Sequence, residues 1–120
     1  MPSKSPLTAL RDILHHIELA EHFVTGLDDK AFLADVRTVY AVTRCLEVIS
    51  EASRRLPADL KAQHLSIPWK NIAGAGNIYR HDYEDVAAQY VWDTAQLALP
   101  PLRVIIQAEI EKLGSSEKLP

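Results

Sequence analysis

Apolar residues recur along most of this chain at the spacing of an α-helix, with polar positions between them. In the first such stretch they lie three, four or seven residues apart, which is one helix face: Leu10, Ile13, Leu14, Ile17 and Val24. Ser5 followed by Pro6 is typical of a helix start, and Gly26 is typical of a helix end. The pattern predicts a first helix between these points.

The second periodic stretch begins at a capping aspartate, Asp28 or Asp29, and runs to about Leu56, just before Pro57. It carries two apolar stripes, which predicts burial from more than one direction and a central place in a bundle. One stripe holds Val36, Tyr40 and Thr43, and the other holds Val42, Cys45, Leu46, Ile49, Ser53 and Leu56. We expect Val42, Leu46 and Ile49 in the core.

Prolines divide the rest of the chain. The run ADLKAQHLSI after Pro57 predicts a turn or a one-turn helix, and Pro68 opens a third helix from Trp69 to about Arg80. A fourth helix is expected over residues 86–97, and the pair at 100–101 should kink or restart the chain. The last apolar stripe, residues 102–113, should end at Gly114. The prediction is one all-α domain over residues 1–120, a bundle of four long helices with short additions.

Composition narrows the function classes. The 120 residues are 48% hydrophobic and 24% charged, with a formal charge of -3, which argues against a surface coated for nucleic acid but allows a local basic patch. The single cysteine, Cys45, excludes an internal disulfide and a cysteine-based zinc site, and we expect it to be buried and inert. No stretch predicts a membrane span or a signal peptide, so a cytoplasmic protein without a membrane partner is expected.

A metal site has one weak candidate in the first helix. Glu18 and His22 lie one turn apart and in principle share a metal. No further ligand lies at a diagnostic spacing, so a solvated helix face is the favoured interpretation, and no metal or cofactor is expected.

The candidate chemistry lies in the stretch PWKNIAGAGNIYRHDYEDV, residues 68–86. We call Asn77, Arg80, His81, Asp82 and Tyr83 the polar cluster. Asn77 and His81 share a helix face, histidine can pass a proton near neutral pH, and arginine can hold charge that develops on a phosphate. The set suits metal-free RNA cleavage, in which a ribose 2′-hydroxyl attacks its own phosphate. The alternative is that His81 only caps a helix end.

A second polar feature lies along one side of the predicted central helix. Arg44, Glu47 and Glu51 form a line along one side of it. The line is either an exposed ladder of ion pairs, or a support that faces the polar cluster and positions it.

Four segments together resemble the HepT-like toxins of the HEPN superfamily: RCLEVISEASRRLP (44–57), IPWKNIAG (67–74), NIYRHDY (77–83) and VWDTAQLALPPL (91–102). The resemblance covers most of the chain in the right order. It implies an antiparallel helical bundle that forms a homodimer, and a metal-independent endoribonuclease with the motif Arg-x(4)-His-x-Tyr. It also implies a partner, an MntA-type nucleotidyltransferase antitoxin that silences the toxin by adding AMP to the motif tyrosine.

The motif can be carried over position by position. The resemblance assigns the motif histidine to His81, the modified tyrosine to Tyr83, and the asparagine after the motif arginine to Asn77. The arginine position itself holds Gly76. Arg80 lies four residues further on, and helical side chains lean back toward the preceding turn, so Arg80 can replace the missing arginine. Lys70 and Arg44 are the other cations considered for this role.

Three functions therefore stay open. The first is an endoribonuclease toxin in which His81 is the acid or base and Arg80 binds phosphate. The second is a catalytically degenerate module that binds its nucleotidyltransferase or a nucleotide, because Gly76 has replaced the arginine. The third is a structural helical dimer. The run AGAG, residues 73–76, permits close backbone approach between two copies, since glycine has no side chain.

Overall fold

The computed structural model describes residues 6–78 and 84–118, without the side chains of residues 75–78, 84–86 and 115–118. Within this part the chain forms seven helices: α1 (Leu7–Val24), α2 (Asp29–Ala34), α3 (Val36–Arg54), α4 (Ala58–Ala62), α5 (Trp69–Ile78), α6 (Glu84–Leu97) and α7 (Leu99–Lys118). The described residues contain no strand, and the all-α prediction is confirmed.

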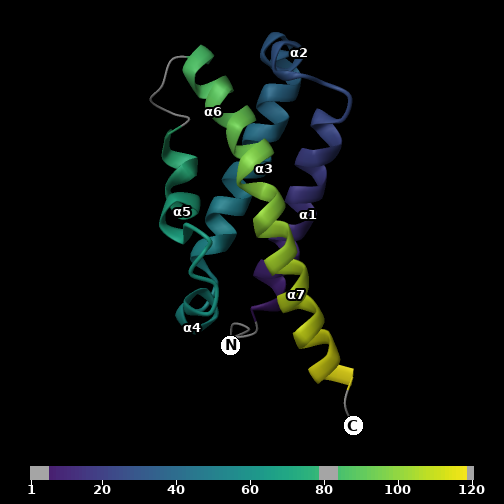
Figure 1. Cartoon of the computed structure of the whole chain (residues 1–120), viewed down its shortest axis with the longest axis vertical. Helices are drawn as coiled ribbons and strands as arrows, with labels where there is room; N and C mark the ends of the chain where they lie inside the picture. Colours follow the sequence, from purple (N-terminus) through teal and green to yellow (C-terminus); the bar gives the residue numbers. More distant parts are fainter. Residues whose placement is uncertain (1–5, 79–83, 119–120) are drawn as a thin grey trace.

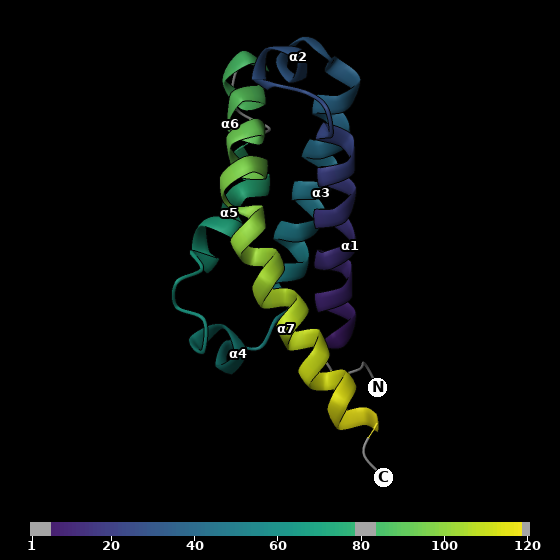
Figure 2. The same cartoon turned by 45° about the vertical axis from the view of Figure 1, so that its right-hand side comes forward.

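The long helices run antiparallel along an elongated body of 52 × 29 × 28 Å. The chain passes up α1, down α3, up α5, and then down α6 and α7, which follow one another in a single column (Figure 1). The short helix α2 crosses one end, and α4 lies near the other (Figure 2). Helix α3 packs against α1, α2, α5 and α6, so its predicted place at the centre of the bundle is confirmed.

The core is built from the predicted apolar stripes. It includes Leu10, Ile13 and Ile17 of α1, Val42, Leu46 and Ile49 of α3, and Leu102 and Ile106 of α7, each exposed by 3% or less. Phe32 of α2 is fully buried and its ring lies 5.1 Å from that of Trp92, which joins the end of the bundle to α6. Cys45 is buried as predicted, and desolvation by this burial raises the pKa of its thiol.

The predicted helix from Asp28 or Asp29 to Leu56 is wrong in one respect, because it is two helices. Asp35 separates α2 from α3 with a non-helical backbone, and its carboxylate accepts hydrogen bonds from the Thr38 hydroxyl at 2.7 Å and the Thr38 N–H at 3.3 Å. These bonds, the hydroxyl first, hold the pKa of Asp35 below its ordinary value. Aspartate favours such a cap over a helix interior, since its short side chain competes for nearby backbone donors.

Two other details differ from the sequence prediction. Val36 and Tyr40 were expected in an apolar stripe against the core, but they are 62% and 66% exposed, so that side of α3 faces outward. The last helix was expected to end at Gly114, yet α7 continues to Lys118. Glycine lowers helix stability by only about 1 kcal/mol relative to alanine, which does not oblige a helix to stop.

The other helix boundaries agree with their sequence signals. Gly26 has a φ of +82°, the left-handed conformation that ends α1. Pro57 precedes the predicted one-turn helix α4, and Pro68 precedes α5. The pair at 100–101 lies in the first turn of α7, where proline is tolerated, so the chain restarts there as one of the two predicted outcomes. None of the described helices is long and apolar enough to cross a membrane.

Candidate functional site

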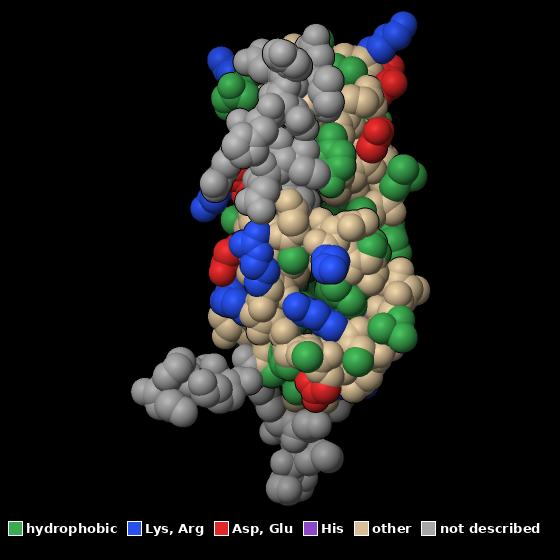
Figure 3. Space-filling view, turned by 90° about the vertical axis from the view of Figure 1, so that its left-hand side faces the viewer, with side chains coloured by type: hydrophobic (Ala, Val, Ile, Leu, Met, Phe, Trp, Pro, Cys, Tyr) green, Lys and Arg blue, Asp and Glu red, His purple; other side chains and the backbone are tan. Residues whose placement is uncertain are grey.

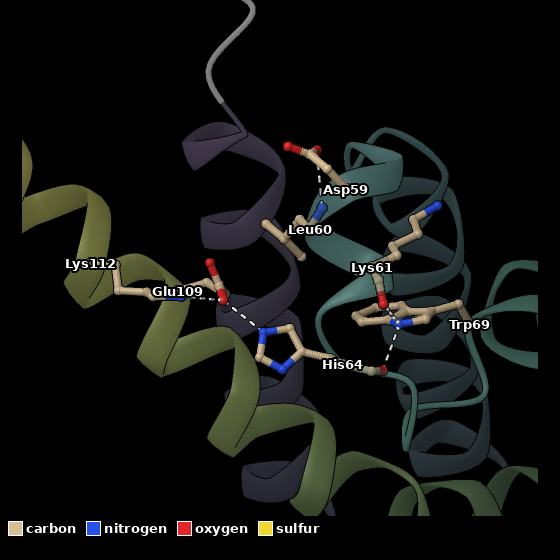
Figure 4. A network of polar contacts seen from close by, with 7 residues as sticks. All are labelled: Asp59, Leu60, Lys61, His64, Trp69, Glu109 and Lys112. Carbon is tan, nitrogen blue, oxygen red and sulfur yellow. Dashed lines mark hydrogen bonds and ion pairs between the residues drawn. The ribbon is translucent and has the colours of Figure 1, made fainter.

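Helix α5, which leads into the polar cluster, is held at its start by a tryptophan. The indole N–H of Trp69 donates to the carbonyl oxygens of Lys61 and His64, at 3.1 and 3.0 Å (Figure 4). Lys61 lies in the last turn of α4 and His64 in the turn that follows it, and Trp69 also packs against the core. The first residue of α5 is therefore tied to the segment before it, which sets where the helix begins.

The same turn is fixed to α7 by a buried carboxylate. The imidazole of His64 lies 2.6 Å from Glu109, which also accepts a hydrogen bond from Lys112 at 3.1 Å (Figure 4). Only 9% of the Glu109 side chain is exposed. Burial by itself raises the pKa of this carboxyl, but the hydrogen bonds from His64 and Lys112 outweigh it and hold the pKa below its ordinary value. Glu109 is thus a buried anion with two donors.

Further along, α5 is held against α3 by two side chains that share one acceptor. The hydroxyl of Ser50 donates to the carbonyl oxygen of Ala73 at 2.7 Å, and the guanidinium of Arg54 donates to the same oxygen at 2.6 Å. Ser50 is buried, whereas Arg54 is exposed. Ala73 lies one helical turn before Gly76 and Asn77, so these bonds fix α5 directly ahead of the polar cluster.

The structure places only part of the predicted site. The backbones of Gly76 and Asn77 lie in the last turns of α5, where their side chains are outside the description, while Lys70 is exposed in its first turn. Arg80, His81, Asp82 and Tyr83 lie outside the described residues, and their roles stay predictions.

The line of Arg44, Glu47 and Glu51 forms ion pairs along α3. Arg44 pairs with Glu47 at 3.4 Å, and Glu51 pairs with Arg55 at 3.4 Å. In the part of the chain that the structure describes, the ion pairs of these three side chains stay on α3 and its C-cap residue Arg55, as the ladder interpretation expects. A role of the line in positioning the polar cluster stays a prediction.

Glu18, which the sequence paired with His22 as a weak candidate metal site, contacts an arginine instead. Glu18 forms an ion pair with Arg103 of α7 at 3.4 Å, and Arg103 also contacts Glu21. Among the described residues no group of three or more His, Cys, Asp or Glu side chains is placed to hold a metal ion. The Glu18 carboxylate therefore joins α1 to α7.

Basic side chains gather on one face of the molecule. Figure 3 shows the side on which α4 and α5 lie, with Lys and Arg side chains grouped near its middle. Arg54 and Lys70 are both exposed; Arg54 contacts α5 through its bond to Ala73, and Lys70 lies in the first turn of α5. A chain with a net charge of -3 thus carries a local basic surface beside the helix that leads to the polar cluster.

The contacts of Ser50, Arg54 and His64 were missed by the sequence prediction. Ser50 and Arg54 lie one turn apart on α3, beside the buried positions Ile49 and Ala52, which is a signal for a polar contact at a helix interface. His64 and Glu109 are 45 residues apart, and nothing in the local pattern pairs them.

Comparison with known proteins gives consistent matches. The model of the ribonuclease HepT-like family matches residues 13–109. A "Putative RNase" of Methanocaldococcus jannaschii is 34% identical over 113 residues, which cover 94% of each chain. A "Probable ribonuclease HepT" of Thermococcus cleftensis is 38% identical over 94 residues, covering 78% of this chain and 86% of that protein. No solved structure matches the chain.

The fold defines a class: a small, all-α antiparallel bundle in which a short fifth helix leads into a polar segment. The matches define the family. The chain belongs to the ribonuclease HepT-like family, and the matched region contains α5 and the whole segment from Asn77 to Tyr83. The resemblance predicted from four sequence segments is confirmed at the level of the family.

Proposed function

We propose that this protein is a metal-independent endoribonuclease of the HepT type. The observation that carries the proposal is the family match over residues 13–109, which spans the motif positions His81 and Tyr83. The matched relatives bear ribonuclease names, including a "Putative RNase" of Caldanaerobacter subterraneus, 31% identical over 91% of this chain. The local basic surface beside α5 supports RNA as the substrate, because phosphate contacts dominate nucleic-acid affinity.

The proposed reaction is an internal transfer at the RNA backbone. His81 assists removal of the proton from a ribose 2′-hydroxyl, whose oxygen then attacks the adjacent phosphorus. The bond from phosphorus to the 5′-oxygen breaks, and that oxygen takes up a proton. The products are a 2′,3′-cyclic phosphate and a 5′-hydroxyl end. Arg80 stabilises the negative charge that develops on the phosphate oxygens.

The regulation we propose comes from the resemblance to HepT toxins. The partner is an MntA-like nucleotidyltransferase antitoxin, and Tyr83 is the residue to which it adds AMP. Tyr83 lies two positions after His81, so a nucleotide attached to its hydroxyl would obstruct the same site. Co-expression with the nucleotidyltransferase, followed by mass spectrometry of the 77–86 segment, tests this: AMP on another residue, or on none, contradicts it.

The second candidate is a catalytically degenerate module that binds its nucleotidyltransferase or a nucleotide. The observation in its favour is Gly76, which stands where the family motif has arginine. If Arg80 does not supply the missing charge, the fold and the partner surface remain while cleavage is lost.

An RNA cleavage assay separates the two candidates. The purified protein, treated with EDTA, is incubated with a mixed RNA, and the product ends are identified. We expect cleavage with 2′,3′-cyclic phosphate ends, and none with His81→Ala at an unchanged helical signal. Equal cleavage by the His81→Ala variant would show that another residue, or a contaminant, is responsible. An inert parent protein favours the degenerate module.

A further inference from the structure

Arg54 differs from the other described arginines around it in its choice of partner. Its neighbour Arg55 contacts two carboxylates, Asp12 at 3.0 Å and Glu51 at 3.4 Å. Arg54 donates instead to a neutral acceptor, the carbonyl oxygen of Ala73. Among the described side chains, which leave out residues 75–86 and 115–120, no carboxylate lies within ion-pair distance of its guanidinium. The positive charge of Arg54 is therefore not neutralised by this part of the chain.

The contact also leaves most of the guanidinium able to bind something else. One terminal nitrogen, Nη2, donates to Ala73, whereas a guanidinium carries five N–H donors. Arg54 is exposed, so a ligand from solvent can reach the remaining donors. The bond to Ala73 already restricts the long Arg54 side chain. A ligand that binds later therefore has less side-chain conformational entropy to remove.

The positive charge of Arg54 lies beside the part of α5 where the family motif begins. Arg54 reaches from α3 to the carbonyl one turn before Gly76, on the helix that leads to the motif histidine. Residues three apart on a helix are surface neighbours, so position 76 adjoins the position where Arg54 is anchored. Lys70, three residues before Ala73 on α5, adds a second exposed cation to that side of the helix.

We propose that Arg54 is an RNA-binding residue, which holds a backbone phosphate of the substrate beside position 76 of α5, where the family motif has its arginine. The inference rests on the proposed ribonuclease function for the identity of the ligand. Its bond to the Ala73 carbonyl positions the guanidinium, and its charge, which no described carboxylate neutralises, binds the phosphate. Arg54, from α3, thus supplies positive charge beside position 76, where this chain has glycine in place of the motif arginine.

The competing explanation is that Arg54 is only a strut between α3 and α5. Ser50→Ala is the control for loss of the contact between α3 and α5, because the Ser50 hydroxyl donates to the same oxygen but carries no charge. Arg55→Met is the control for loss of one positive charge, because Arg55 is the next residue and two carboxylates already neutralise it. The variants Arg54→Met, Arg54→Lys, Ser50→Ala and Arg55→Met therefore separate the two roles.

The measurement is binding to a short 2′-O-methyl RNA, which cannot be cleaved because its 2′-oxygen is blocked, across a series of salt concentrations. Arg54→Met should weaken binding about five- to tenfold at low salt. It should also reduce the slope of log affinity against log salt by about 0.7, the loss of one phosphate contact on a single strand. Arg54→Lys should keep the parent slope, and so should Ser50→Ala and Arg55→Met.

Each result decides something. If Arg54→Met keeps the parent slope, or weakens binding no more than Arg55→Met, Arg54 does not bind phosphate and the inference is overturned. Equal weakening by Arg54→Met and Ser50→Ala without a change of slope identifies a strut. If the parent protein binds this RNA through Arg54 but leaves unmodified RNA intact, the ribonuclease proposal fails and the Arg54 inference stands. A parent that does not bind RNA overturns both.

Discussion

The imidazole of His64 and the carboxylate of Glu109 meet at 2.6 Å, although 45 residues separate them along the chain. The contact joins the turn before α5 to the middle of α7. The Trp69 indole N–H donates to the His64 carbonyl in that turn and to the Lys61 carbonyl in α4. A buried acid thereby helps to fix the start of the helix that leads to the polar cluster.

Glu109 should make the stability of the fold depend on acid. Its folded-state pKa lies below the ordinary value of 4.5, so its contribution is present above that value and is lost as pH falls through the folded pKa. Glu109→Gln should lower the free energy of unfolding by about 1–3 kcal/mol at neutral pH, because a charged acceptor is lost. The difference between parent and variant should be smaller at an acid pH below 4.5 than at neutral pH.

Urea unfolding at both pH values checks this prediction. The matched control is Glu111→Gln, an exposed glutamate two residues further on α7. A Glu109 variant whose stability difference stays the same at both pH values would show that the ionised carboxylate is not what stabilises the contact.

Leu46 should be one of the positions that hold the bundle together. It lies in α3 and is only 3% exposed, so Leu46→Ala removes buried methyl groups and should lower the unfolding free energy by about 2–5 kcal/mol. Val104→Ala is the control, because Val104 is 66% exposed and a surface change is expected to stay within about 0.5 kcal/mol. If thermal melting of the two variants were alike, the placement of α3 in the core would be wrong.

The proposed homodimer should depend on the small residues of α5. A Cβ atom added at Gly74 would meet nothing within 4 Å among the described residues, and the same is true at Gly114 on α7. Because the Cβ position is open, we expect the single chain to accept Gly74→Leu. The leucine should block a close approach of a second copy to the AGAG run. We expect the parent to scatter light as twice 13.4 kDa and Gly74→Leu to shift toward the monomer.

Gly114→Leu is the control for that experiment, and it should leave the particle mass unchanged. A parent that scatters as 13.4 kDa at micromolar concentration contradicts the dimer. A Gly74→Leu variant that stays dimeric at the same concentration moves the interface away from AGAG.

The arginine of the motif gives the sharpest prediction about catalysis. If Arg80 replaces the arginine missing at position 76, Arg80→Ala should cost as much cleavage activity as His81→Ala, about 3–4 kcal/mol of transition-state stabilisation. Adding Gly76→Arg to that variant should recover part of the rate, because the two positions are four residues apart in sequence, the spacing of one helical turn. The measurement is the initial rate of RNA cleavage.

Two outcomes contradict the relocation. If Arg80→Ala stays fully active, another cation such as Lys70 or Arg44 acts on the phosphate. If the parent is inert and Gly76→Arg alone creates activity, the chain is a degenerate toxin. In that second case Tyr83 would still be the residue to examine for attached AMP.

The sequence by itself determined most of the helical architecture. Apolar residues at helical spacing predicted the core positions of α1, α3 and α7, because a helix must bury its apolar face whatever it packs against. Prolines and Gly26 predicted most boundaries, since their effects on the backbone are local. Four segments were also enough to indicate the family.

Other features were decided by the tertiary structure. Val36 and Tyr40 have the spacing of a buried stripe, yet they are exposed, because nothing in the described chain packs on that side of α3. The capping role of Asp35 depends on Thr38 and on where α2 turns across the end of the bundle. Local patterns record how apolar a helix face is, but not which neighbour covers it.

The contacts around the candidate site could not be predicted from local sequence patterns either. The sequence pointed to the segment after α5, but not to the contacts of Arg54 with Ala73 or of His64 with Glu109. Such pairs join helices that are distant along the chain, so no periodicity encodes them. Only the packing of α3 and α7 around α5 and its preceding turn brings the partners within hydrogen-bond distance.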